Sequence, residues 1–229
     1  MLLFEDDDLL VVDKPAGLMS VPGRGPDKQH CLLGVLHSLG YAALVVHRLD
    51  TATSGVMVFA KHIKAQQFLS KAFAQRLTHK TYQAVVQGAL IAPTQAATTE
   101  WQSIDAPLII DWPNRPKSKV CTDTGKPALT LWQVAADATN ALLHTNPQTT
   151  RVSLRPITGR THQLRVHLRH LGHPIVGDAL YHPSYQHLSN EAGPSGALAP
   201  ARLLLHATDL SVPSLRGGDT LKWHSPVPF

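Results

Sequence analysis

The chain has 229 residues, of which 43% are hydrophobic, and its 21 basic and 16 acidic side chains give a formal net charge of +5. Two cysteines far apart in the sequence argue against a disulfide framework, and no basic leader or bilayer-length apolar run is present. We therefore expect a cytoplasmic protein with a substantial core and no membrane segment. The modest positive charge is compatible with an RNA partner.

In chain order, the hydrophobic patterns predict both strands and helices. Strands are expected at residues 45–46, 56–60, 82–86, 129–134 and 152–154, and helices at residues 31–39 and 63–76 and between Thr161 and Gly172. Strands outnumber helices and do not alternate with them, which favours an α+β fold. Scattered prolines, glycines and small polar residues predict loops at residues 88–118, 137–150 and 182–200.

The run from His47 to Gly55 carries Asp50 two residues after Arg48, between an apolar stretch and a predicted strand. A short polar turn between buried strands can hold a carboxylate at the floor of a cleft, where it can act as a nucleophile. However, Asp followed by Thr, Ser and Gly is also common in ordinary turns. On this segment alone, an ordinary turn is the simpler interpretation.

Residues 154–172 read as a strand, a Thr-Gly turn and a helix, with Thr161 as the expected N-cap and Gly172 as the stop signal. At helical spacing, Leu164, Leu168 and Leu171 form an apolar stripe. The adjacent stripe is cationic and consists of His162, Arg165 and Arg169. Residues 161–171 contain no acidic side chain that could pair with these cations. Arg165 is therefore the best candidate for a partly buried arginine that needs an anion, and Asp50 is one available anion.

Together with residues 11–18 and 80–86, these two segments resemble the RluA-type pseudouridine synthases, with four motifs in the expected order. Residues 18–24, 111–117 and 124–128 resemble the branch of the family that modifies both ribosomal and transfer RNA. The resemblance implies one α+β catalytic domain over residues 1–229, with a mixed, largely antiparallel β-sheet flanked by helices and loops. It also implies that the small N-terminal RNA-binding domain of some relatives is missing.

The resemblance further implies roles for individual residues. Asp50 would be the catalytic aspartate, Tyr82 the active-site tyrosine and Arg165 the cation paired with the aspartate. Arg48 would enter the RNA stack, and further substrate contacts would come from His47, Thr53, Arg160, His162, Arg115 and Lys117. The reaction breaks the N-glycosidic bond of uridine, turns the base and rejoins it through carbon, without metal or cofactor. The expected partners are stem-loops of 23S ribosomal RNA and the anticodon loop of tRNA, and the expected state is a monomer.

The residue types suit this chemistry, because cleavage places positive charge on the sugar, where a carboxylate can stabilise or attack it. Abstraction of a proton from the ribose by Asp50 is an alternative role. Tyr82 is also compatible with an ordinary aromatic residue of a β-strand, without a role in catalysis. The basic residues around Trp112 fit either a loop that touches phosphates or a solvated loop: Arg115, Lys117, Lys119 and Lys126.

Two other functions are compatible with parts of the sequence. A metal-dependent hydrolase is suggested by closely spaced histidines, although their spacing is poor and no carboxylate lies among them: His162, His167, His170 and His173. An RNA-binding or ribosome-assembly protein without catalysis is the second alternative. The intact set of Asp50, Tyr82 and Arg165 argues against it, since binding alone does not need these residues.

Overall fold

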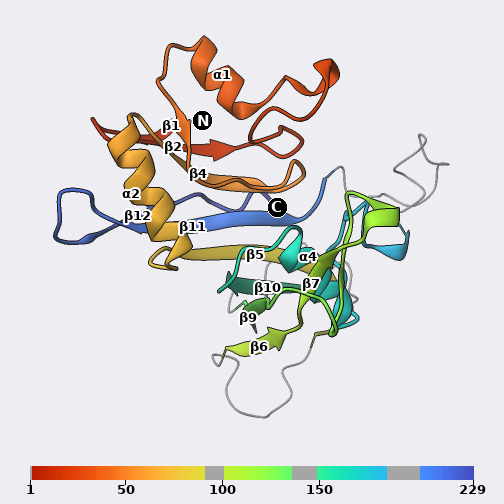
Figure 1. The fold of residues 1–229 in the computed structure, drawn as a ribbon. Helices are drawn as coiled ribbons and strands as arrows, with labels where there is room; N and C mark the ends of the chain where they lie inside the picture. Colours follow the sequence, from red (N-terminus) through yellow and green to blue (C-terminus); the bar gives the residue numbers. More distant parts are fainter. Residues whose placement is uncertain (1, 91–100, 136–148, 185–201) are drawn as a thin grey trace. The chain divides into compact units, whose positions relative to one another are not determined.

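The computed structural model describes residues 2–90, 101–135, 149–184 and 202–229 (Figure 1). Most of the loops predicted at residues 137–150 and 182–200 lies outside these ranges. The chain divides into two units, the first formed by Met1–Thr81 and His206–Phe229 and the second by Tyr82–Leu205. That residues 1–229 act as one catalytic domain stays a prediction.

Unit 1 is built on strands from two distant parts of the chain. Its elements are β1 (Leu2–Glu5), β2 (Leu9–Lys14), η1 (Pro26–Lys28), α1 (Leu32–Ser38), β3 (Leu44–Val45), β4 (Ser54–Ala60), α2 (Ile63–Ala74), β11 (Leu205–Pro213) and β12 (Thr220–His224). Antiparallel pairs join β1 to β2, β2 to β4, β3 to β4 and β11 to β12. In contrast, β4 and β11 run parallel, which makes the sheet mixed.

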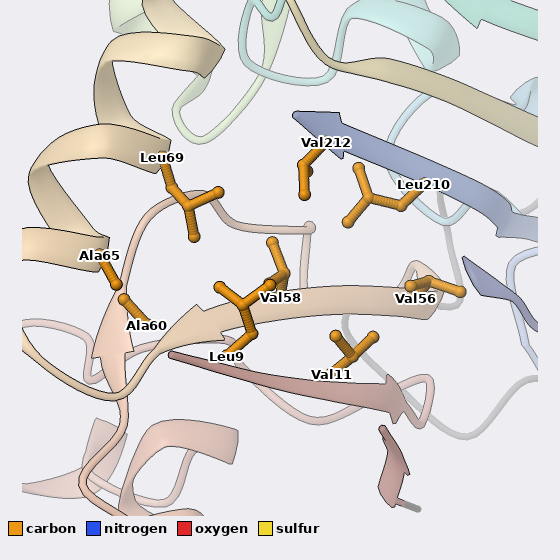
Figure 2. Packing of buried hydrophobic residues seen from close by; sticks show 9 residues of the cluster. All are labelled: Leu9, Val11, Val56, Val58, Ala60, Ala65, Leu69, Leu210 and Val212. Carbon is orange, nitrogen blue, oxygen red and sulfur yellow. The ribbon is translucent and has the colours of Figure 1, made fainter. Parts of the chain in front are cut away.

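The core of unit 1 lies between this sheet and α2 (Figure 2). Side chains two residues apart along a strand share one face, so that alternate residues of three strands meet the helix. The cluster consists of Leu9 and Val11 on β2, Val56, Val58 and Ala60 on β4, Ala65 and Leu69 on α2, and Leu210 and Val212 on β11. This core supports β4, and the candidate site residue Asp50 starts the turn that precedes β4.

The parallel pairing of β4 with β11 depends on a glycine. Gly55 lies opposite Ala207 and has φ +119°, a backbone conformation that residues other than glycine rarely adopt. A Cβ atom at Gly55 would lie 2.2 Å from the carbonyl oxygen of Ala207. Only glycine therefore allows these strands to approach this closely.

The antiparallel strands β5, β10, β9 and β6 lie side by side in this order in unit 2. Its elements are β5 (His79–Gln87), which starts in unit 1, β6 (Gln102–Asp105), β7 (Leu108–Ile110), η2 (Trp112–Asn114), β8 (Ser118–Val120), β9 (Leu129–Val134), β10 (Thr149–Pro156) and α4 (Gln163–His170). The short strands β7 and β8 pair separately. A small core gathers Leu108, Ala128, Val166 and Tyr181.

The predicted fold class, α+β with a mixed and mostly antiparallel sheet, is confirmed, as are the predicted strands and helices within a few residues. The loop predicted at 88–118 is wrong for its second half, which contains β6, β7 and the start of β8. Of the described helices, none has the length and apolar character that a bilayer crossing requires. Both cysteines, Cys31 and Cys121, are free thiols.

Candidate active site

The turn that carries Asp50 is anchored within unit 1. The N–H of Thr53 donates to the carbonyl oxygen of Asp50 at 3.1 Å, which closes a turn immediately before β4. Leu49, just before Asp50, is bound twice by the buried Ser20 hydroxyl, which donates to the Leu49 carbonyl at 2.7 Å and accepts its N–H at 3.1 Å. The half-buried Asp50 side chain is thus held by a fixed backbone.

A buried lysine fixes the other side of the same turn. Lys14, the last residue of β2, is fully buried. Its ammonium group donates to the carbonyl oxygens of Pro15 at 2.9 Å, Leu18 at 2.7 Å and Thr51 at 3.1 Å. Because a buried ammonium group is costly without acceptors, these bonds tie residues 14–18 firmly to the residue after Asp50.

His47 has a packing environment in unit 1. Its Nε2 accepts the N–H of Val58 at 3.1 Å, and its ring stacks on Phe73 at a centroid distance of 4.6 Å. Burial, with a smaller contribution from the positive charge of Lys80, lowers the pKa of His47 to about 3. The ring is therefore neutral at physiological pH, with Nε2 as an acceptor. Its predicted contact with substrate stays a prediction.

Arg165 is held by a carboxylate in unit 2 that the sequence analysis did not name. Its side chain is 5% exposed, and its Nε and Nη2 donate to Oδ2 and Oδ1 of Asp178 at 2.8 and 2.7 Å. Asp178 is fully buried and also accepts the backbone N–H groups of Leu180 and Tyr181 through Oδ1. The prediction of a buried arginine that needs an anion is confirmed, and Asp178 supplies an anion within unit 2.

Tyr181 lies against both Arg165 and His162. The guanidinium carbon of Arg165 lies 5.1 Å from the centre of the Tyr181 ring. The Tyr181 hydroxyl accepts the N–H of Ser118 at 2.7 Å and lies 2.7 Å from Nδ1 of His162. Tyr181 is 1% exposed, so these contacts lie away from solvent.

The start of α4 differs from the prediction, because Thr161 is not its N-cap. His162 occupies that position with φ +56°, and the helix begins at Gln163. The buried Gln163 side chain organises this start through bonds of 2.7–3.0 Å to the Thr158 hydroxyl, the Arg160 N–H, the Leu129 carbonyl oxygen and the Thr130 hydroxyl. The helix ends at His170, and Gly172 follows as the predicted stop signal with φ +86°.

Of the predicted basic stretch, Arg115 and Lys117 lie in the connection between β7 and β8, whereas Lys119 lies within β8 and Lys126 after it. Arg115 lies over the ring of Trp112 at 4.5 Å, and Trp112 is 63% exposed. Lys119 pairs with Asp111 at 3.3 Å, which reduces the net positive charge here. An exposed aromatic ring with a stacked guanidinium can pack against a nucleotide base.

The remaining predicted residues fall within one unit or the other. Arg48 is exposed and Thr53 buried in unit 1. In unit 2, Tyr82 lies on β5 opposite Leu154, Arg160 donates through Nε to the Pro127 carbonyl at 3.1 Å, and Lys117 is half-buried.

Three of the four histidines that suggested a metal site, namely His162, His167 and His173, have other contacts. His167 is fully buried between the Thr130 hydroxyl and the Ala106 carbonyl, at 2.9 Å from each, and burial lowers its pKa. Nδ1 of His173 lies 2.8 Å from the Gln87 carbonyl. Within the described ranges, no three potential ligands gather around a common point. These contacts favour packing roles over metal binding.

Comparison with known proteins identifies the family. Residues 8–170 match the family model described as RNA pseudouridylate synthase. The chain belongs to this family. The dual-specificity RNA pseudouridine synthase RluA of Vibrio vulnificus is 47% identical over 210 residues, covering 92% of this chain and 76% of the relative. The Escherichia coli K12 protein of the same name is 42% identical over 229 residues, covering 100% and 94%.

A solved structure supports the same assignment. Human RNA Pseudouridylate Synthase Domain Containing 1 matches with a TM-score of 0.74 and 26% identity, over 100% of this chain and 83% of that protein. The predicted RluA-type family and enzyme class, an isomerase acting on RNA, are thereby confirmed. The individual residue roles stay predictions.

Sequence reasoning missed several residues that support the candidate residues of this pseudouridine synthase. Lys14 lies in the motif at residues 11–18, but no sequence pattern indicated that its ammonium group would bind the carbonyl oxygen of Thr51. Asp178 lies 13 residues after its partner Arg165, beyond helical spacing. The Gly-Asp pair at residues 177–178 reads as an ordinary turn, so the only available signal was the need of Arg165 for an anion.

Proposed function

We propose that this chain is a dual-specificity pseudouridine synthase that isomerises uridine in 23S ribosomal RNA and in the anticodon loop of tRNA. The support is the identity of 42–47% to two relatives that carry this description. The motifs at residues 111–117 and 124–128 agree with this assignment.

Asp50 is the catalytic residue in this proposal, and the observation that carries it is the doubly anchored turn. Ser20 binds the residue before Asp50, while Lys14 binds the residue after it. Such preorganisation is needed where a carboxylate must meet the positive charge that develops on the ribose. An ordinary surface turn requires no buried lysine.

Arg165 keeps the Asp50 carboxylate ionised and aimed. A guanidinium has five N–H donors, of which Asp178 engages two. Its permanent positive charge favours the ionised form of a nearby carboxylate. Tyr82 covers one face of the uracil, because its ring is apolar and its hydroxyl can share a proton.

The target uridine must leave its stack before Asp50 can reach the ribose. Extrusion costs a few kcal/mol, which contacts to the RNA must offset. Arg48, which is exposed, fills the vacated space in this proposal. The connection between β7 and β8 supplies further contacts through Trp112, Arg115 and Lys117.

The decisive experiment replaces Asp50 by Asn in the full chain. We expect tritium release from uridine-labelled RNA to fall below detection, while RNA affinity stays within about threefold, since the carboxylate acts in the chemical step. Asp7→Asn, at an exposed position, is the matched control and should keep full activity. Appreciable turnover by the Asp50→Asn variant would contradict the assigned role.

Substrate choice is tested by mapping pseudouridine in total RNA from cells with and without the gene. Loss of modification in both RNA classes is expected, and loss in one class alone would contradict dual specificity. Activity should survive a chelator, because no metal takes part in the proposed reaction; metal dependence would favour the hydrolase alternative. The protein should elute as a monomer and fractionate with the cytoplasm.

A further inference from the structure

We propose that Tyr181 is a positioning residue that holds Arg165 and His162 at the start of α4 in their working geometry. This inference rests on the proposed function, because it takes Arg165 as the cation that acts on Asp50. Tyr181 itself has no assigned role in the chemistry. Its ring, its hydroxyl and its backbone N–H each contact a different part of the arrangement.

The ring and the backbone of Tyr181 act on Arg165. The guanidinium lies over the ring at 5.1 Å, within the range of cation–π attraction. Oδ1 of Asp178 accepts both Nη2 of Arg165 at 2.7 Å and the N–H of Tyr181 at 3.1 Å. The arginine is thus confined between a carboxylate and a ring that are fixed to one another.

The hydroxyl of Tyr181 acts on His162. The hydroxyl oxygen accepts the Ser118 N–H at 2.7 Å and also lies 2.7 Å from Nδ1 of His162, so that one hydroxyl bonds to both residues. His162 has φ +56°, a conformation that costs a residue other than glycine about 1–2 kcal/mol. The two rings meet edge to face at 83°, with their centroids 5.6 Å apart. Tyr181 therefore stabilises the strained residue from which α4 starts.

The same hydroxyl ties α4 to the proposed RNA-binding connection. Ser118 is the first residue of β8 and follows Lys117 directly. The chain of contacts runs from the Ser118 N–H through the Tyr181 hydroxyl to His162, three residues before Arg165. RNA bound at this connection would therefore be held in a fixed position relative to the catalytic cation.

Loss of the hydroxyl should impair catalysis more than binding. Phenylalanine keeps the ring and the backbone N–H, and it removes the hydroxyl together with its bonds to Ser118 and His162. A displacement of about 1 Å at a reacting group can reduce the rate about a hundredfold. The RNA contacts themselves remain in place, so affinity should change little.

The test compares steady-state pseudouridine formation by Tyr181→Phe with that of Tyr41→Phe. Tyr41 is the matched control, because its hydroxyl has no hydrogen-bond partner among the described residues. We expect kcat of Tyr181→Phe to fall about tenfold to a hundredfold, with KM and the RNA Kd within about twofold of wild type. Unchanged kcat, or a raised KM with unchanged kcat, would overturn the proposal.

Two substitutions at His162 provide a test that does not depend on the folding of Tyr181→Phe. Asn and Gly both tolerate the left-handed conformation, but only the Asn side chain offers a hydrogen-bonding group near the position of Nδ1. We expect His162→Asn to retain at least fivefold more kcat than His162→Gly, and equal kcat values would refute the inference. The wild-type turnover and its loss in Asp50→Asn test the proposed function separately.

Discussion

Replacing Asp178 by Ala would leave the Arg165 guanidinium buried without its anion. Both side chains are at most 5% exposed, and their two hydrogen bonds measure 2.7 and 2.8 Å. Breaking a buried pair on one side costs about 3–5 kcal/mol. With a urea dependence of about 2 kcal/mol per molar, the unfolding midpoint should fall by about 2 M. Pseudouridine formation should be lost as well, since Arg165 would no longer be held.

Urea titrations followed by circular dichroism measure the effect. Asp7→Ala is the matched control: Asp7 pairs with Arg216 at 3.1 Å, but these side chains are 91% and 65% exposed, so the midpoint should not move. The double variant Arg165→Met with Asp178→Leu should recover most of the stability but no activity, because apolar residues can replace a buried pair. A loss below about 1 kcal/mol in Asp178→Ala would refute the reasoning.

Three further predictions concern stability and RNA binding. Burial lowers the pKa of His47 from 6.5 to about 3 in the folded state. As the pH falls, the unfolded state therefore takes up this proton at a higher pH than the folded state does. The free energy of unfolding should therefore fall by up to about 1.4 kcal/mol per unit as the pH drops from 6.5 towards 3, and urea titrations of His47→Gln should lack this slope. Gly55→Ala should lower the melting temperature strongly, because its Cβ would collide with the Ala207 carbonyl, whereas Gly159→Ala, with open space around it, should not; equal melting temperatures would contradict the close approach. Trp112→Ala should weaken RNA binding by about 1–3 kcal/mol in filter-binding assays if the exposed ring stacks on a base, and an unchanged Kd would exclude that contact.

Local signals in the sequence predicted part of the site correctly. The lack of acidic residues on α4 predicted a buried Arg165 that needs an anion, and the structure has one. The same reasoning named Thr161 as the N-cap, because a threonine before a helix usually caps it. In the structure, the Gln163 side chain and the left-handed His162 form this start, and neither has a local signature.

The part of the fold that was missed depends on contacts between distant residues. Residues 9–14 and 205–213 form β2 and β11, which flank β4, yet neither was named as a strand. The near-continuous burial of β2 leaves little of the alternation that marks a half-exposed strand. Likewise, the bond from Lys14 to the Thr51 carbonyl joins residues 37 positions apart, so no local pattern could indicate it.

The discontinuity of unit 1 has a consequence for its synthesis. The core around Val56 and Val58 is completed by Leu210 and Val212, which the ribosome adds only after all of unit 2. At about 5–20 residues per second, the apolar face of β4 waits on the order of 10 s for β11. A nascent chain stalled before β11 should therefore bind chaperones. In the released full-length chain, β11 should cover that face, and the chaperones should dissociate.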